Sequence, residues 1–449
     1  MNTPAGRLTL CLLLTAAATA ACTTTTGTST TTDPAGTAAG SGWGPCGDLT
    51  GYTALLGVPG VEDLTCATTT VPVDPDDPAA GTLDVAFSRL GSGTKDVLLL
   101  NPGGPGLEGR TMPLLVDLVS DLAADFDLVG VDVRGTGATG PMPCEELLAD
   151  EPPVPDDATL DDPQQARAAV STYAAAVAAA GQACAGSDPE LIASLTLANA
   201  ADDLDAVREA LGVERVSYLG VSWGTALGAA YQSQHPEHLD RMVLDSMVWP
   251  ADDPAADIAA VLAAVGTGTG ADDGGSAEAA TDATGPEEPE DATDPDDDRA
   301  TDDAADLDLR VVPLSYGARL AYTCDEAPAA AGPDAQWDAH TALTDRLGLA
   351  RSTRIPHPAS SEAAGVSACT GWPFPGPGPA ARATGSSVLV VGHTEDAVTP
   401  FVWSERATDA LDAELVRSDD DAHGGGLGTC LDVITGFLRT GETTAVCAS

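Results

Sequence analysis

The sequence predicts an α/β fold with a mostly parallel central sheet into which a cap domain is inserted. Early apolar runs bounded by glycine-rich turns are typical of buried strands, and they lie at residues 83–90, 97–100 and 126–131. From residue 198 onward, helical and strand patterns alternate, as parallel strands joined by crossover helices require. The alternation stops after residue 248 and resumes at residue 385, so two separate parts of the chain are expected to build the sheet.

The later elements follow from apolar spacing and from the residues that end helices. Residues 198–211 carry apolar side chains at helical spacing, and Gly212 is placed to end that helix. Strands are expected at residues 215–219, 241–244, 387–391 and 414–416. The core is therefore assigned to residues 46–248 and 385–449, and the cap to residues 249–384 with a helix at about 314–322.

The N-terminus has the layout of a secretory signal over residues 1–21. Arg7 precedes a short apolar run and then small residues, and the run is too short to span a bilayer. Residues 22–45 are rich in Thr, Gly, Ser and Ala and are expected to form a flexible tether. Residues 19–22 resemble a bacterial lipobox, so lipid attachment at Cys22 and ordinary signal-peptidase cleavage are both open. The protein is expected to be exported, either as a secreted protein or lipid-anchored to the outer face of the cell membrane.

Acidic residues dominate the charge of the 449-residue chain. Asp and Glu outnumber Lys and Arg by 69 to 19, which gives a formal charge of −50. Nucleic acids and anionic headgroups bind concentrated positive charge, so we expect no nucleic-acid partner and no membrane contact except through a lipid anchor. Much of the charge lies in a low-complexity tract of the cap at about residues 266–308. This tract has too little apolar surface to fold and is expected to be disordered.

Cysteine usage agrees with export to an oxidising compartment. Removal of Cys11 with the signal and loss or lipidation of Cys22 leaves eight of the ten cysteines, an even number that suggests four disulfides. Pairing of sequence neighbours gives Cys46–Cys66, Cys144–Cys184, Cys324–Cys369 and Cys430–Cys447. No CxxC pair occurs, so zinc is the less favoured interpretation, and neither a metal nor a cofactor is expected.

The pentapeptide Gly220-Val221-Ser222-Trp223-Gly224 fits the G-x-S-x-G pattern, in which small residues allow a strained strand-to-helix turn to present a serine hydroxyl. The pattern alone is weak evidence in a chain with 48 glycines. Here, however, an apolar strand leads into it and a helix expected at residues 225–234 leaves it. That context is typical of the α/β-hydrolase fold and makes Ser222 the predicted nucleophile.

A serine hydroxyl needs a neighbouring base, and the base needs an acid that fixes its tautomer. In this fold the acid and then the histidine follow the nucleophile along the chain. His423, in a glycine-rich loop after the last expected strand, is the predicted base. Asp396 is the predicted acid, with Glu395 and Asp245 as alternatives. The histidines expected at the surface are His235, His238, His340 and His357.

Two backbone amides are predicted to form an oxyanion hole, because negative charge on the carbonyl oxygen must be met by preorganised N–H donors. Trp223 supplies the amide that follows the nucleophile. The glycine-rich residues 101–106 follow a strand directly, where the second donor is expected. Gly104 is the residue we select from this run.

Five segments carry a family resemblance: NPGGPG at 101–106, FDLVGVDVRGTGATG at 126–140, YLGVSWGTALGAAY at 218–231, MVLDS at 242–246 and VLVVGHTEDAVTP at 388–400. Together they resemble the secreted tripeptidyl aminopeptidase-like branch of the proline iminopeptidase family of α/β-hydrolases. The resemblance extends from residue 64 to Cys447 and skips the acidic tract.

The resemblance implies a triad of Ser222, Asp396 and His423, and release of short peptides from a free amino terminus. The chain departs from the family pattern at residues 107–109, which read Leu-Glu-Gly where the family often has Gly-Ser-Gly. It also has Trp223 where the family has tyrosine.

Three functions are compatible with these residues. The first is an exported serine peptidase that acts on peptide substrates through an acyl-enzyme. The second is an esterase or lipase that uses the same triad. The third, from another class, is a catalytically inactive binding protein of the cell surface that uses the cap as a docking site.

Overall fold

The computed structural model describes residues 42–50, 58–140, 142–148, 152–156, 159–160, 162–249, 254–264, 312–325, 330, 332–350, 366–374, 376, 381–443 and 447. The predicted signal segment, the lipidation site Cys22, His357 and the acidic tract lie outside the described residues, as does almost all of the predicted tether. The description that follows concerns the compact unit from residue 40 to residue 449.

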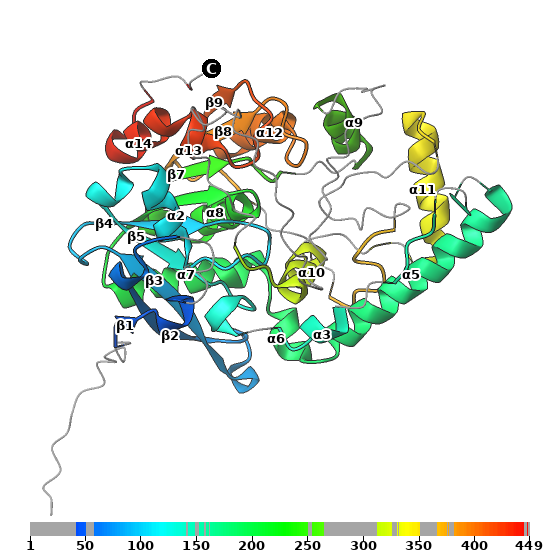
Figure 1. The fold of residues 1–449 in the computed structure, drawn as a ribbon, viewed down its shortest axis with the longest axis horizontal. Helices are drawn as coiled ribbons and strands as arrows, with labels where there is room; N and C mark the ends of the chain where they lie inside the picture. Colours follow the sequence, from blue (N-terminus) through cyan, green and yellow to red (C-terminus); the bar gives the residue numbers. More distant parts are fainter. Residues whose placement is uncertain are drawn as a thin grey trace, which may run out of the picture. The chain divides into compact units, whose positions relative to one another are not determined.

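A nine-stranded sheet in the order β1-β2-β3-β5-β4-β6-β7-β8-β9 forms the centre of the described structure (Figure 1). Its strands are β1 (Gly44–Pro45), β2 (Leu64–Pro72), β3 (Thr82–Leu90), β4 (Asp96–Asn101), β5 (Phe126–Val131), β6 (Val216–Val221), β7 (Leu239–Asp245), β8 (Ser387–His393) and β9 (Glu414–Ser418). Pairing is antiparallel from β1 through β3 to β5, and parallel from β5 onward through β9. The mostly parallel α/β sheet predicted from the sequence is confirmed.

The helices of the described residues are α2 (Met112–Val119), α3 (Glu145–Leu148), α5 (Pro163–Ala185), α6 (Pro189–Ala193), α7 (Leu197–Leu211), α8 (Trp223–Gln234), α9 (Pro254–Ala264), α10 (Tyr316–Asp325), α11 (Pro333–Leu347), α12 (Phe401–Leu411), α13 (Gly426–Thr429) and α14 (Leu431–Thr440). Short 3₁₀ turns lie at Gly47–Leu49, Val61–Asp63, Pro78–Ala80, Leu122–Ala124, Gly137–Thr139 and Pro236–His238. The helix expected at residues 198–211 ends as predicted, because Gly212 adopts the left-handed conformation and caps α7.

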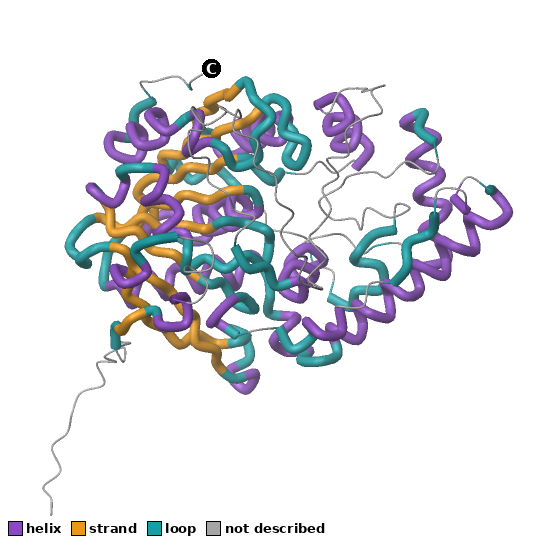
Figure 2. The backbone as a smooth tube through the Cα atoms, viewed as in Figure 1, coloured by secondary structure: helices purple, strands orange, loops and turns teal. Residues whose placement is uncertain are grey.

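Helices cover both faces of the sheet (Figure 2). Leu99 of β4 packs in the cluster formed with α7, α8 and α12, whereas Leu98 and Leu100 pack in the cluster formed with α2 and α14. Strands β5 and β6 are buried at every position. Burial on both faces explains why these strands read as continuous apolar runs rather than as alternating patterns.

A second module lies beside the sheet and draws on two parts of the chain. The long helix α5, which precedes the expected cap boundary at residue 249, packs along α11 from inside the expected cap (Figure 1). Ala166, Val170 and Ala174 of α5 form a buried cluster with Trp337 of α11. Helix α5 is long and apolar enough to cross a membrane, by length and composition only. The core helix of a soluble protein also meets this criterion.

Four disulfides join cysteines within the described residues: Cys46–Cys66, Cys144–Cys184, Cys324–Cys369 and Cys430–Cys447. Each links sequence neighbours, as the spacing suggests. Two of them tie α5 to the segment before α3 and α10 to the segment 366–374, and their cysteines lie in the large buried cluster that includes the sheet. These covalent links therefore lie where the module meets the core of the sheet.

Replacing Cys324 and Cys369 together with serine should lower the free energy of unfolding by about 2 to 4 kcal/mol, because the bond restricts the unfolded chain. The two cysteines are 45 residues apart. Urea unfolding without reductant measures the change. An unfolding midpoint equal to that of the parent protein would contradict a stabilising role for this bond.

Candidate active site

Ser222 stands at a sharp turn between β6 and α8, with φ of 55° and ψ of −126°. A non-glycine residue in this region costs about 1–3 kcal/mol, which the surrounding structure must offset. Close packing of glycines makes the turn possible: a Cβ atom at Gly220 would lie 2.4 Å from the carbonyl oxygen of Gly224, and one at Gly224 would lie 2.8 Å from that of Asn101. The strained strand-to-helix turn predicted from G-x-S-x-G is present.

Asp396 and His423 meet across two loops, with 2.9 Å between Asp396 Oδ2 and His423 Nδ1. Asp396 is fully buried, and its carboxylate also accepts bonds from the amides of Val398 and Thr399 and from the Thr399 hydroxyl. Burial acts to raise the pKa of Asp396, but the bonds from His423 and Thr399 outweigh it and hold that pKa below its usual value. Asp396 is therefore an anion that orients the imidazole.

The loop that carries His423 is fastened to the strand beside Ser222. The Gly424 amide donates to Ser246 Oγ at 2.8 Å, and the Gly426 amide donates to Asp245 Oδ2 at 2.9 Å. Asp245 is the register partner of Val221 across β6 and β7, and its carbonyl accepts the Ser222 amide at 2.9 Å. One residue of β7 thus contacts both the nucleophile turn and the histidine loop.

The remaining ring nitrogen of His423 is the one left for Ser222, because Nδ1 binds Asp396. Within the described part of the chain, the Ser222 hydroxyl has no hydrogen bond to His423 or to another residue. Such bonds are often long in ligand-free enzymes and tighten when substrate is bound.

Neither alternative acid binds the ring of His423 among the described residues. Asp245 Oδ1 binds Nε2 of His393 at 2.9 Å, and Glu395 is exposed. Asp396 is the carboxylate that contacts the ring of His423.

The loop of residues 101–106 packs against the nucleophile turn. A Cβ atom at Gly103 would lie 2.4 Å from the Val221 carbonyl oxygen and 3.0 Å from the Trp223 amide nitrogen. The Gly103 amide donates to Asn101 Oδ1, so it is not available to a substrate. Among the described residues, no partner binds the amides of Gly104 and Trp223, as an oxyanion hole requires.

Helix α10 places the cap against this loop. The Ser315 amide, just before α10, donates to the Gly106 carbonyl at 2.9 Å. The ring of Tyr322 on α10 contacts the ring of Trp223, with 4.8 Å between their centres. Trp223, next to Ser222, is thus part of the contact between α8 and α10.

Four functional or supporting residues were not singled out by sequence reasoning. Thr399 and Ser246 bind the loops of Asp396 and His423, and buried His393 forms an ion pair with half-buried Asp420 beside them. The position of Thr399, three residues after Asp396 in a turn, is a local signal that could have identified it.

The surface position expected for His340 is wrong, since the residue is 1% exposed within the module beside the sheet.

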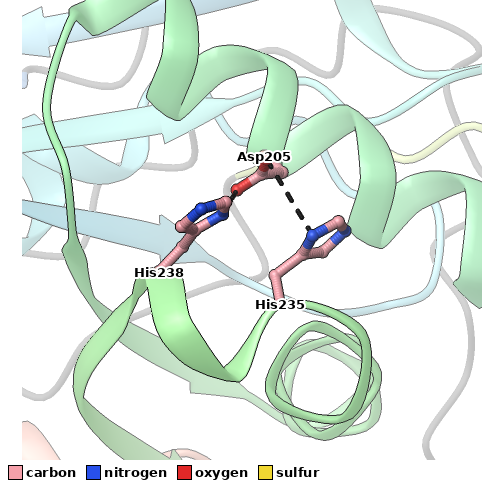
Figure 3. Close-up of side chains that lie close together, drawn as sticks. All are labelled: Asp205, His235 and His238. Atoms are coloured by element: carbon pink, nitrogen blue, oxygen red, sulfur yellow. Dashed lines mark hydrogen bonds and ion pairs between the residues drawn. The ribbon is translucent and has the colours of Figure 1, made fainter.

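A group of Asp205, His235 and His238 has ligand atoms within 4.8 Å of one another, a spacing that a metal ion could bridge (Figure 3). Arg208, however, binds both oxygens of Asp205, at 2.7 and 3.0 Å. Burial acts to raise the pKa of Asp205, but bonds from Arg208 and His238 lower it to about 2. A bound guanidinium opposes a second cation, so the group is better explained as an ion-pair network at the far end of α8.

Two family models match the chain. A model described as alpha/beta hydrolase fold matches residues 96–264, and one described as TAP-like protein matches residues 358–447. The chain has the α/β-hydrolase fold. The predicted resemblance to tripeptidyl aminopeptidase-like proteins is confirmed by the second match and by the similarity to a tripeptidyl aminopeptidase.

Three relatives illustrate what this chain is similar to. It is 35% identical over 202 residues to a tripeptidyl aminopeptidase of Streptomyces coelicolor, which is 42% of this chain and 36% of the relative. It is 32% identical over 216 residues to the serine protease Hip1 of Mycobacterium tuberculosis, covering 47% of this chain and 40% of the relative. A carboxylesterase B of the same species is 28% identical over 222 residues, with the same two coverages. The matched part is therefore less than half of each relative.

Replacing Gly103 with alanine should slow labelling of Ser222 by a fluorophosphonate about tenfold or more. The new Cβ would collide with the Val221 carbonyl, and φ of +94° disfavours any side chain. Gly436→Ala in α14, where a Cβ meets nothing within 4 Å, is the matched control and should label at the parent rate. Equal rates for the two variants would contradict the contact between this loop and the nucleophile turn.

Proposed function

We propose that this α/β hydrolase is an exported serine peptidase that releases short peptides, of tripeptidyl size, from free amino termini. Ser222 is its nucleophile, His423 its base and Asp396 its acid. The observation that carries the proposal is the contact of buried Asp396 with half-buried His423, whose loop is bonded to the strand beside the Ser222 turn and to the residue that follows that strand.

The reaction follows from this arrangement. Nε2 of His423 takes the proton of Ser222 as Oγ attacks the scissile carbonyl, and Asp396 stabilises the imidazolium. The amides of Gly104 and Trp223 receive the negative oxygen. His423 then protonates the leaving amine, and water, activated by the same ring, hydrolyses the acyl-enzyme.

Two observations favour peptides and export. The relatives of highest identity named here are a tripeptidyl aminopeptidase and a serine protease. Four disulfides suit an oxidising compartment outside the cytoplasm. A lipid anchor at Cys22 and the division into core and cap are further parts of this proposal, and they rest on the sequence pattern.

The second candidate is an esterase with the same triad, favoured by the similarity to a carboxylesterase B. Acyl transfer from esters needs no additional group, because the alkoxide leaves more easily than an amine. Rapid turnover of acyl esters with no turnover of peptides would support this candidate over the first.

Hydrolysis of tripeptide chromogenic amides tests the first proposal. The free amine form should be cleaved, and the acetylated form should react about 100-fold more slowly or worse, because a site built for an ammonium group rejects its neutral analogue. Ser222→Ala should lower kcat by about 10⁴-fold or more. Equal rates on free and acetylated substrates would remove the aminopeptidase assignment, and unchanged cleavage by Ser222→Ala would remove the serine mechanism.

A further inference from the structure

A second histidine lies fully buried beside the triad and binds two carboxylates. Nδ1 of His393, the last residue of β8, is 2.5 Å from Asp420 Oδ1, and Nε2 is 2.9 Å from Asp245 Oδ1. The side chains of His393 and Asp245 are 0% and 1% exposed. The reaction proposed above uses none of these three side chains.

The two bonds require a protonated ring. A neutral imidazole has one N–H donor, and its other nitrogen carries a lone pair that a carboxylate repels. Since both partners are carboxylates, both nitrogens of His393 must carry hydrogen. Burial alone would lower the pKa of His393, but Asp245 and Asp420 outweigh it and raise that pKa to about 9. The charged ring is therefore the neutral-pH form.

The same two carboxylates hold the loop of His423 on both sides of the catalytic ring. Asp420 Oδ1 accepts the Ala422 amide at 3.2 Å, one residue before His423. Asp245 Oδ2 accepts the Gly426 amide at 2.9 Å, three residues after it. His393 thus joins the two carboxylates that fix the ends of the loop segment from residue 422 to residue 426.

We propose that protonated His393 is a positioning residue that holds the His423 loop in its active geometry, and that loss of its proton sets the alkaline limit of activity. This inference rests on the proposed serine mechanism. When the ring becomes neutral, one carboxylate faces a lone pair instead of a donor. Asp420, the more exposed of the two, is then released, and the loop loses one of its anchors.

The direction of the pH effect follows from the charges that face His393. Those on the described residues are Asp245 from β7 and Asp420 from the segment after β9. Because the pKa of His393 is raised from 6.5 to about 9 in the folded protein, its charged form stabilises the fold fully below about pH 6.5. The contribution is lost as the pH rises through about 9.

The test is the pH dependence of fluorophosphonate labelling of Ser222 in the full chain. The probe has no amine, so substrate titration cannot produce an alkaline limb. In the parent protein the rate should fall above about pH 9. Asp420→Asn removes one carboxylate from His393 and should move this fall down by about one to two pH units. Asp419→Asn, the exposed neighbour paired with Arg417, is the matched control and should leave the fall in place.

His393→Gln should label about 10- to 100-fold more slowly at neutral pH and show no fall near pH 9, because no titrating group remains there. Circular dichroism at each pH separates loss of positioning from unfolding. An alkaline fall that is the same in Asp420→Asn and the parent, or that coincides with unfolding of the parent, would overturn the positioning role. Absence of Ser222 labelling in the parent at every pH would instead contradict the proposed serine mechanism itself.

Discussion

The parallel register of five adjacent strands, in the order β4-β6-β7-β8-β9, is the constraint on which the site depends. Parallel strands bring their carboxyl ends to one edge of a sheet, and the register aligns Asn101 with Gly220, Val221 with Asp245, and His393 with Ser418. The residues that follow these strands form the loop of residues 101–106, the turn at Ser222, the loop of Asp396 and the loop of His423. A slip of one residue in any pair would turn the aligned side chains to the opposite face.

Asp245 holds the parts of the site in place through hydrogen bonds. Its backbone carbonyl binds the Ser222 amide, and its side chain binds the Gly426 amide and the ring of His393. A buried carboxylate is costly unless its oxygens are paired, and here each oxygen has a partner. The three side chains of the proposed triad come from distant parts of the chain, yet a single residue of β7 contacts the elements that carry two of them.

Much of the core and the site could be predicted from the sequence because their signals are local. Buried parallel strands are apolar runs, and the turn at Ser222 needs glycines at Gly220 and Gly224. Strand β2 was missed because its threonine-rich sequence is half exposed and lacks such a run. The role of His393 could not be predicted from the residues near it in the sequence, since its partners are 148 and 27 residues away. The packing of α5 on α11 is likewise a contact between distant segments, and its alanine-rich face gives little signal.

The most direct test of the account is a crystal structure of the protein after reaction with a fluorophosphonate. The account predicts phosphorus bonded to Ser222 Oγ, with the phosphoryl oxygen about 3 Å from the amides of Gly104 and Trp223. Nε2 of His423 should lie within hydrogen-bond reach of Ser222 Oγ, with Nδ1 still bound to Asp396. An adduct on another residue, or a His423 ring turned away from the Ser222 adduct, would contradict it.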